Sequence, residues 1–360
     1  MPFRLAERAI VAGAFPAASL AVTSGTQLLA LKAFGRFTFD PESPLVASAT
    51  LFDIASVTKV VATTAMAMIL YERGLLDLDS PVAGIVPEFI SASPEARNDV
   101  RRQSVNVRML LAHTSGLAAH EKFYLIARTP DQLFNAVCAS TLTSDPGSRA
   151  EYSDIGFILL GVLLERIAGE SLEVFCQREV FGPLGMISTT FNPPTELRPQ
   201  IPPTADERKT GCFRGRIIQG EVQDENCSVL GGVAGHAGLF STSEDLSRFA
   251  RAMLQGGRPI LRPETVALFT RREATAGTHA LGWDTPSTPS QSGKYFGPNS
   301  FGHLGYTGTS LWIDPERGLS ITLLTNRTWP DCSNQAIKQV RPRVHDAIVE
   351  ALTTQSGRNH

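Results

Sequence analysis

The segment at residues 57–71 carries the strongest hydrophobic signal in the chain, because apolar side chains occupy nearly every face of the helix that it would form. Gly74 follows this segment at a position that suits the end of a helix. A helix that is apolar all round lies inside a protein rather than on its surface. We therefore predict a buried central helix over these residues.

Strand patterns lie at the two ends of the chain. Residues 18–23 and 28–37 are predicted as strands joined by a turn at Ser24-Gly25, after a short amphipathic helix at residues 3–12. The remaining predictions are strands at 310–313 and 319–325, helices at 105–112, 154–167, 171–180, 244–254 and about 333–353, and a hairpin-like stretch near 214–222.

Strands at both ends of a mainly helical middle predict a fold of the α/β (α+β) class, with one sheet closed by the two termini. The chain carries no internal repeat. We expect a single unit over residues 1–360, with a sheet half at about 1–50 and 275–360 and a mainly helical half at about 51–274.

Composition narrows the class of partner. Hydrophobic residues make up 42% of the chain, charged residues 19%, and the net charge is −2. This balance gives no electrostatic reason to expect nucleic acid or an anionic membrane as partner. A small-molecule substrate is therefore expected. The composition does not indicate an oligomeric state. The five cysteines are widely spaced without a C-x-x-C pair, which predicts reduced, mostly buried thiols, and no metal or cofactor is expected.

The amino terminus carries charged residues where a secretory signal would need its apolar stretch. No apolar run approaches the roughly 18 to 20 residues of a membrane span. These observations predict a cytoplasmic protein.

Candidate chemistry begins at Ala55-Ser56-Val57-Thr58-Lys59, at the start of the predicted central helix. A serine and a lysine three positions apart share one helix face. The serine also lies near the unpaired N–H groups and the positive dipole end of the helix. Burial and neighbouring cations can lower the pKa of the lysine, which can then accept the hydroxyl proton.

Two further segments carry the same kind of chemistry. Tyr152 precedes Ser153-Asp154 at a predicted helix entrance, where its phenol can shuttle protons or simply pack. The glycine-rich stretch at residues 302–310 leads into a strand, where a backbone N–H can complete an oxyanion hole. Three such signals in this order in one chain favour a hydrolytic site.

These motifs resemble those of the β-lactamase-related serine hydrolases, which include class C β-lactamases, D,D-peptidases, carboxylesterases of family VIII and muropeptide amidases. The resemblance runs from about residue 8 to 335. It rests on Ser56-Val57-Thr58-Lys59, on Leu110-Leu111-Ala112-His113-Thr114-Ser115-Gly116-Leu117, on Tyr152-Ser153-Asp154, on residues 231–242 and on the stretch from His303 to Pro315. It implies an antiparallel sheet packed on a helical half, with the active site between them.

The resemblance also implies roles for individual residues. Ser56 is expected as the nucleophile, Lys59 as its base, and Tyr152 as the proton carrier for the leaving group. The backbone N–H groups of Ser56 and Tyr306 are expected to form the oxyanion hole, with Gly305 beside them.

Two positions depart from the family pattern. Asp154 stands where an asparagine is common, and a carboxylate can only accept hydrogen bonds, so we expect it to pair with Lys59 or to bind a substrate N–H or hydroxyl. His303 replaces the lysine of the K-T-G box. A histidine near its reference pKa of about 6.5 is mostly neutral at pH 7, so its protonation is expected to favour anionic substrates in acid.

Other polar residues keep more than one interpretation. His113 is expected to be a structural histidine, and His120 to line the cleft mouth or a solvated loop. His236 lies between glycines, which suits close approach to substrate or to another loop, and it is kept as a substrate-binding candidate. Asn326-Arg327, just past a strand, is expected to touch the cleft edge or, more simply, to include a surface arginine in a salt bridge.

Asp224-Glu225-Asn226 resembles a stretch of the muropeptide-amidase branch, with Gln223 in place of the histidine that commonly precedes it. We therefore predict a serine hydrolase that forms an acyl-enzyme from an ester or amide, such as a small ester or a cell-wall muropeptide amide. The alternatives are a β-lactamase or D,D-carboxypeptidase, and a penicillin-binding sensor that does not turn over. The loss of a fixed cation at His303 predicts ester hydrolysis with little cephalosporin turnover.

Overall fold

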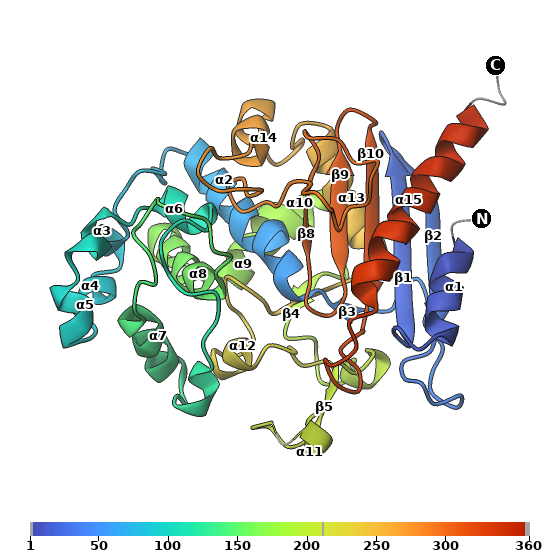
Figure 1. The fold of residues 1–360 in the computed structure, drawn as a ribbon, viewed down its shortest axis with the longest axis horizontal. Coiled ribbons are helices and arrows are strands. Elements are labelled where there is room, and N and C mark those ends of the chain that lie inside the picture. The colour runs from blue at the N-terminus through green and yellow to red at the C-terminus, as the bar shows by residue number, and fades with distance from the viewer. Residues whose placement is uncertain (1–2, 211, 357–360) are drawn as a thin grey trace.

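The computed structural model describes residues 3–210 and 212–356. Its main feature is a five-stranded antiparallel sheet in the order β2-β1-β10-β9-β8. The N-terminal strand β1 pairs with the last strand β10 from Ala18↔Thr325 to Ser24↔Leu319, so the two ends of the chain meet inside the sheet (Figure 1). The predicted sheet of both termini is thereby confirmed. The strands are β1 (Ala17–Ser24), β2 (Gln27–Gly35), β8 (Phe301–Leu304), β9 (Ser310–Asp314) and β10 (Leu319–Thr325).

Helices cover both faces of this sheet. The helices α1 (Phe3–Val11) and α15 (Ile337–Ser356) pack against one face, and side chains such as Leu20 and Ile321 form a core beneath them. The helix α13 (Ser243–Leu254) packs against the opposite face, where Leu324 points into the main core. Every residue of β10 is buried, as expected for a strand covered on both sides.

The predicted central helix is confirmed as a buried helical segment, and its geometry is not uniform. A 3₁₀ turn (Ala55–Val57) leads into a widened π-helical stretch (Lys59–Thr64), and a regular α-helix, α2 (Ala65–Glu72), follows. All residues from 59 to 70 are buried. The π-helical stretch contains polar side chains that the hydrophobic pattern hides: Lys59 Nζ and Thr63 Oγ1 donate to the carbonyls of His236 and Gly235.

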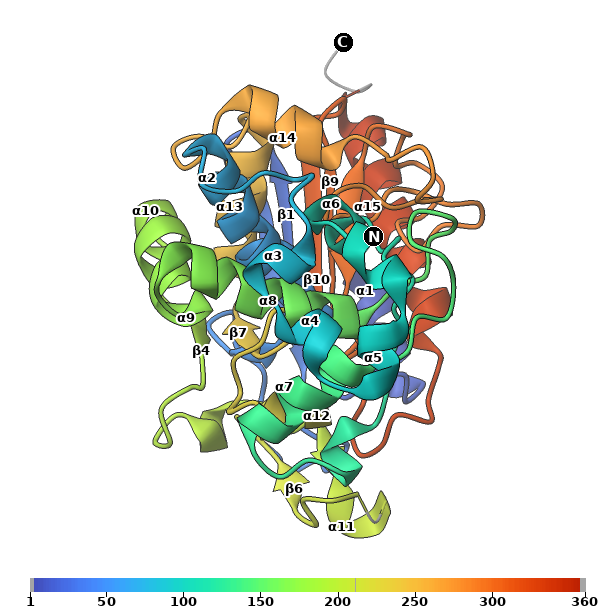
Figure 2. The same cartoon turned by 90° about the vertical axis from the view of Figure 1, so that its left-hand side faces the viewer.

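The other helices form the half of the molecule that faces the viewer in Figure 2, with the sheet behind it. The predicted helices at 154–167 and 244–254 agree closely with the observed ones, whereas that at 105–112 starts later because the Asn106 side chain caps Met109 N. The helices are α3 (Val82–Ile85), α4 (Glu88–Ser91), α5 (Pro94–Asn98), α6 (Val107–Leu111), α7 (Pro130–Ala139), α8 (Asp154–Ala168), α9 (Leu172–Cys176), α10 (Gly182–Leu184), α11 (Glu207–Thr210), α12 (Glu225–Val229) and α14 (Pro263–Thr270).

Short strands complete the fold, and one prediction among them is wrong. The strands β3 (Phe52–Asp53), β7 (Leu239–Ser241) and β4 (Thr190–Phe191) form a three-stranded sheet. The stretch at 214–222 is not a local hairpin, because β6 (Ile217–Ile218) pairs with β5 (Ala205–Asp206). Arg214 binds Glu207 and the carbonyls of Val222 and Gln223, and these contacts hold the segment against earlier residues.

Two compositional expectations can be compared with the structure. All five cysteines are free; Cys138, Cys176 and Cys227 are buried, while Cys212 is partly exposed and Cys332 is exposed. Among the helices within the described ranges, none combines the length and the apolar character needed to cross a bilayer.

Candidate active site

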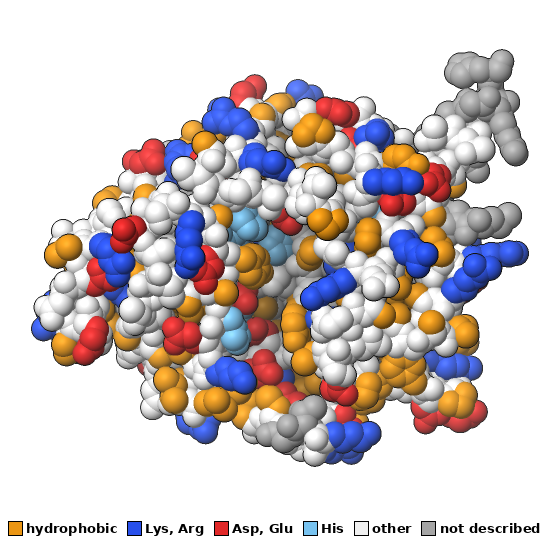
Figure 3. Space-filling model, in the orientation of Figure 1, with side chains coloured by type: hydrophobic (Ala, Val, Ile, Leu, Met, Phe, Trp, Pro, Cys, Tyr) orange, Lys and Arg blue, Asp and Glu red, His pale blue; other side chains and the backbone are white. Residues whose placement is uncertain are grey.

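A cleft of about 720 Å³ lies between the helical half and the sheet. In the space-filling view it is the hollow near the middle of the face, with histidine and acidic side chains on its floor (Figure 3). It brings together most of the predicted site residues, including Ser56, Tyr152, Asp154, His303 and Tyr306, while Lys59 lies beneath the surface. Its lining also includes Ala55, His120, Lys122, Tyr124, Gln223, Asp224, Glu225, Ala237, His279, Asp284, Leu304, Gly305, Arg327, Cys332, Gln335, Ile337, Lys338 and Arg341.

Ser56 lies on a strained turn at the base of the cleft. Ala55, the residue before it, has a φ of 47°, which side-chain-bearing residues rarely adopt. The turn is held by Asp53, whose Oδ1 accepts from Ala55 N at 2.8 Å and whose Oδ2 accepts from Gln223 N at 2.6 Å. Burial raises the pKa of Asp53 to about 6. Asp53 was not predicted as a site residue, because a lone aspartate in a strand belongs to no motif.

Lys59 is fully buried one helical turn from Ser56, and its ammonium position has three neighbours. Its Nζ lies 3.0 Å from Ser56 Oγ, 2.6 Å from Asp154 Oδ1 and 3.0 Å from the carbonyl oxygen of His236. Burial lowers the pKa of Lys59, and the Asp154 carboxylate works in the opposite direction. The expected pairing of Asp154 with Lys59 is therefore observed.

These three contacts suit both charge states of the lysine. The Asp154 carboxylate and the His236 carbonyl can only accept hydrogen bonds, whereas the Ser56 hydroxyl can donate or accept. A charged lysine donates three hydrogen bonds. A neutral lysine donates two, to Asp154 and His236, and turns its lone pair toward the Ser56 hydroxyl. The geometry thus places a base beside a hydroxyl without any rearrangement of heavy atoms.

Tyr152 and Asp154 flank the start of α8. Between them Ser153 caps the helix, because its Oγ accepts from Gly156 N at 3.0 Å. This cap places the Tyr152 ring 4.9 Å from Lys59 Nζ. Burial, and after it the charge of Asp154, raises the pKa of Tyr152 well above its usual value, while a hydrogen bond with Ser56 lowers it. The side chain is therefore a neutral phenol, which can act as a proton donor.

His113 supports the tyrosine from behind. Its Nδ1 accepts from Ser153 N at 3.0 Å, so the ring carries its proton on Nε2. The ring packs 4.7 Å from the ring of Tyr152, and burial lowers the pKa of His113 well below its usual value. The expected structural role is supported by the Nδ1 contact, although Nε2 is buried without a hydrogen-bond partner.

His303 lies where it was expected, but its pKa differs from the expected one. It lies in β8 and lines the cleft, with its ring 5.9 Å from that of Tyr152. Its Nδ1 donates to the carbonyl of Leu304 at 2.8 Å, which leaves Nε2 as an acceptor. Burial, together with the positive charge of Lys59, lowers the pKa of His303 to about 3. The expectation of a charge change in mildly acid solution is therefore wrong.

Gly305 and Tyr306 follow His303 at the end of β8. A Cβ atom at Gly305 would lie 2.6 Å from the carbonyl oxygen of Ile54, so only glycine allows this strand end to approach the Ser56 turn. Thr307 Oγ1 donates to the carbonyl of Asp53 at 2.8 Å and fixes the same approach. The backbone of Tyr306 is thereby held at the cleft beside Ser56.

His236 contributes its backbone to the site, and its ring contacts the side chain of Asp224. The ring is 1% exposed, and its Nε2 lies 2.9 Å from Asp224 Oδ1. Burial works to raise the pKa of Asp224, but the charge and hydrogen bond of His236 outweigh it and hold the pKa below its usual value. The neighbouring Gly235 packs against Gly161 of α8, where a Cβ would lie 2.1 Å from the Phe157 carbonyl oxygen. The observed approach is thus to a helix, whereas the two interpretations of His236 named substrate or another loop, and its role toward substrate stays a prediction.

Two further predictions are settled by position. His120 lines the cleft, with its Nδ1 3.9 Å from Asp154 Oδ2. Arg327 is not a surface arginine in a salt bridge: it is 6% exposed, and its Nε donates to the carbonyl of Tyr306 at 2.7 Å. Of the two interpretations, contact with the cleft edge is the observed one, since Arg327 is among the residues that line the cleft.

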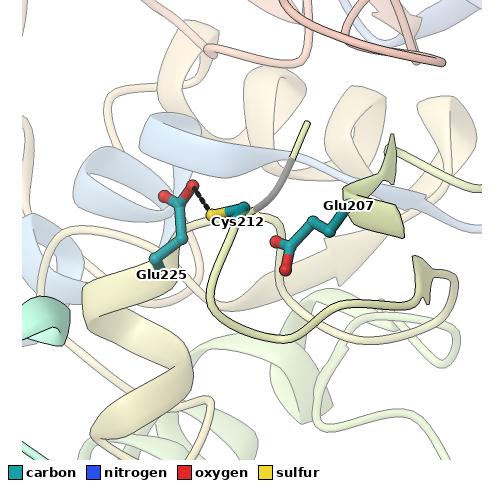
Figure 4. Close-up of side chains that lie close together, drawn as sticks. All are labelled: Glu207, Cys212 and Glu225. Atoms are coloured by element: carbon teal, nitrogen blue, oxygen red, sulfur yellow. Dashed lines mark hydrogen bonds between the residues drawn. The ribbon is translucent and has the colours of Figure 1, made fainter. Parts of the chain in front are cut away.

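A group of Glu207, Cys212 and Glu225 lies beside the cleft (Figure 4), with potential ligand atoms within 4.8 Å of one another. Its groups are already engaged. Glu207 Oε1 accepts from Arg214 Nε at 2.8 Å, and Cys212 Sγ lies 3.4 Å from Glu225 Oε1. Burial raises the pKa of Cys212 to about 11, which keeps the thiol protonated at neutral pH. A cation would have to displace both a guanidinium and a thiol proton, so these residues fit a structural brace better than a metal site.

Comparisons with known proteins agree with this geometry. The family model described as Beta-lactamase matches residues 3–341. The N-acetylmuramyl-L-alanine amidase of Bacillus subtilis (strain 168) is 32% identical over an alignment of 359 residues, which covers 90% of this chain and 80% of that protein. The solved structure of EstCE1, a hydrolase with promiscuous acyltransferase activity, has a TM-score of 0.74 at 22% identity, covering 96% of this chain and 97% of that one.

The octameric penicillin-binding protein homologue from Pyrococcus abyssi has a TM-score of 0.73 at 19% identity, covering 97% of this chain and 77% of that chain. At these identities the two solved structures show a shared fold. The family model and the amidase, each matched over most of the chain, show the family. The chain belongs to the β-lactamase family and is a serine hydrolase.

Proposed function

We propose that the protein hydrolyses an amide or ester by a two-step acyl transfer in which Ser56 is the nucleophile. The observation that carries this proposal is the 3.0 Å contact between Ser56 Oγ and Lys59 Nζ at the base of the cleft. A serine hydroxyl is a weak nucleophile until a neighbouring base accepts its proton. Lys59 is the group that meets this requirement, since its pKa is lowered by burial.

In the first step, the neutral Lys59 accepts the hydroxyl proton while Ser56 Oγ attacks the carbonyl carbon. The oxyanion that forms is stabilised by the backbone N–H groups of Ser56 and Tyr306. Ser56 belongs to a 3₁₀ turn, where the first N–H groups have no partner within the helix. Donors of this kind, aimed at the developing charge, are commonly worth about 10²- to 10³-fold in rate.

Tyr152 completes the acylation. Its phenol donates a proton to the leaving group as the carbonyl–leaving-group bond breaks, and the raised pKa of Tyr152 keeps that proton in place beforehand. Lys59, charged after the attack, then gives its extra proton to the phenolate oxygen of Tyr152, so that both groups regain their starting charge. Water then hydrolyses the acyl-enzyme through the same groups in reverse.

For the natural substrate we propose a cell-wall muropeptide amide. The 32% identity to an N-acetylmuramyl-L-alanine amidase supports this class. His303 is neutral and offers a hydrogen-bond acceptor where the family commonly has a cation. This supports slow turnover of cephalosporins, whose carboxylate would meet no charge at that position.

A substrate panel of short p-nitrophenyl esters, muropeptides, D-amino-acid peptides and the cephalosporin nitrocefin tests the proposal. We expect hydrolysis of the esters and of a muropeptide amide bond, with loss of both activities in Ser56→Ala. Ser188→Ala, outside the cleft, is the matched control and should keep both. Faster hydrolysis of nitrocefin than of the esters at pH 7 would contradict the substrate assignment, and activity retained in Ser56→Ala would contradict the mechanism.

A further inference from the structure

Two buried arginines line the sheet side of the cleft. Arg327, just after β10, is 6% exposed, and Arg341, in α15, is 4% exposed. Both contribute to the cleft wall. Guanidinium groups are rarely buried unless a carboxylate or several carbonyls surround them. The hydrogen-bond partners of each guanidinium therefore indicate whether it has a structural role or is free to bind a ligand.

Arg327 is largely satisfied by backbone. Its Nε donates to the carbonyl of Tyr306 at 2.7 Å, and its Nη1 contacts the carbonyls of Cys332 and Asn334 at 3.2 Å and 3.3 Å. The guanidinium also stacks on the Tyr306 ring, with 4.5 Å between its carbon and the ring centre. Arg327 thus fixes the loop after β10 against the residue whose N–H is proposed for the oxyanion hole.

Arg341 is not satisfied in the same way. Its Nη1 donates to the amide oxygen of Gln291 at 3.0 Å, and its Nε is buried without a partner. Within residues 3–210 and 212–356, no carboxylate lies in ion-pair distance of either arginine. The buried Arg214 differs, because the carboxylate of Glu207 neutralises it.

The acidic residues of the cleft do not supply the missing charge. Asp154 is paired with Lys59, Asp224 contacts His236, Asp284 lies 4.0 Å from His279, and Glu225 accepts from the Cys212 thiol at 3.4 Å. Two exposed lysines, Lys122 and Lys338, also line the cleft. Cations at the rim of a cleft raise the local concentration of anionic ligands.

Burial without a carboxylate partner disfavours the charged form of Arg341 most. Burial, and after it the positive charge of Arg327, lowers the pKa of Arg341 to about 9. An unpaired buried cation is unfavourable unless an opposite charge reaches it. A guanidinium presents parallel N–H groups that match a carboxylate in two-point contact.

We propose that Arg341, supported by Arg327, forms an anion subsite in the cleft wall that binds a carboxylate carried by the substrate. This inference rests on the proposed acyl transfer at Ser56 and names the substrate class for it: an amide or ester that also bears a carboxylate. Arg341 lies in α15 rather than in β8, so the subsite serves a carboxylate placed elsewhere in the cleft than at His303. A muropeptide, whose peptide part carries free carboxylates, meets this requirement.

Two pairs of esters test the subsite. Mono-p-nitrophenyl adipate and p-nitrophenyl hexanoate differ by a carboxylate on the acyl group, whereas 4-acetoxybenzoate and phenyl acetate differ by one on the leaving group. In at least one pair we expect the wild-type enzyme to favour the carboxylate member in kcat/KM, after subtraction of spontaneous hydrolysis. Arg341→Gln should reduce that preference about tenfold or more, because one charged hydrogen-bond partner is lost.

Arg343→Gln is the matched control, since Arg343 is exposed on the same helix outside the cleft lining and its loss changes the net charge equally. It should leave the preference unchanged, whereas Arg341→Lys, which keeps the charge and loses the two-point contact, should retain part of it. If Arg341→Gln does not fold, two other results test the subsite. Adipate, but not adipamide, should inhibit hydrolysis of p-nitrophenyl hexanoate by the wild-type enzyme. Arg341→Lys should show the partial preference described above.

The subsite is overturned if the wild type shows no preference in either pair and no inhibition by adipate, or if the preference survives in Arg341→Gln. Failure of the proposed function has a different signature: the neutral esters would not be hydrolysed, or their hydrolysis would persist in Ser56→Ala.

Discussion

The Lys59 ammonium position lies 2.6 Å from a carboxylate oxygen of Asp154, and this pair decides the charge of the proposed base. Burial favours a neutral lysine, whereas the carboxylate favours the charged form. An asparagine, which is common at this position in the family, would exert no such pull. The aspartate therefore sets the pH range in which Ser56 can be activated.

Asp154→Asn should move the acid limb of the kcat/KM profile to lower pH. Removing the carboxylate removes the effect that raises the pKa of Lys59, so the lysine loses its proton at a lower pH and the active form persists in more acid solution. The profile is measured with a neutral p-nitrophenyl ester. Asp145→Asn, which removes an exposed carboxylate elsewhere, is the control and should leave the limb in place. A shift of the limb to higher pH would show that Lys59 is not the base.

Tyr152→Phe should affect substrates according to their leaving groups. A phenol that protonates the leaving group contributes about 10²- to 10⁴-fold for an alkyl ester or amide, and much less for p-nitrophenolate, which leaves readily without a proton. Comparison of kcat/KM for ethyl and p-nitrophenyl esters of one acid should show this difference. Equal losses for the two esters would mean that Tyr152 acts by packing rather than by proton transfer.

Gly305→Ala should lower kcat/KM by about tenfold or more, because the added Cβ would lie 2.6 Å from the Ile54 carbonyl oxygen and push the strand end away from the Ser56 turn. Gly84→Ala is the control, since an added Cβ at that position contacts nothing within 4 Å. Circular dichroism confirms that both variants fold. Full activity in Gly305→Ala would show that the approach of β8 to the turn is not required.

His303 should not act as a charge switch. Because the pKa of His303 is lowered to about 3, its ring stays neutral throughout pH 5.5 to 8. The ratio of kcat/KM for mono-p-nitrophenyl adipate to that for p-nitrophenyl hexanoate should therefore be constant over this range. A fall in the ratio centred near pH 6.5, absent in His303→Ala, would mean that His303 titrates in the cleft and binds the carboxylate.

The sequence was sufficient for four strands of the main sheet and for the reactive motifs, because each depends on a local pattern, whereas β8 was not predicted as a strand. Strand-like runs of residues located β1, β2, β9 and β10, and the spacing of Ser56 and Lys59 implied a shared helix face that the structure contains. It could not show the contacts made across the fold. Asp53 holds Gln223, which is 170 positions away, and no periodicity marks such a pair.

The same limit applies to charge and burial. Arg327 follows a strand in a polar stretch that is typical of a surface loop, and its burial becomes visible only when the chain folds back onto it. His303 was expected to titrate near its reference pKa because a sequence does not report desolvation. The short pairing of β5 with β6 likewise depends on Glu207 and Arg214, two charged residues that no strand pattern includes.

The central claim is that Ser56 is acylated, and mass spectrometry after treatment with a fluorophosphonate probe tests it most directly. The account predicts one adduct per chain on the peptide that contains Ser56, with labelling abolished in Ser56→Ala and slowed in Lys59→Ala, where no base accepts the hydroxyl proton. An adduct on another residue, or undiminished labelling of Ser56→Ala, would contradict it.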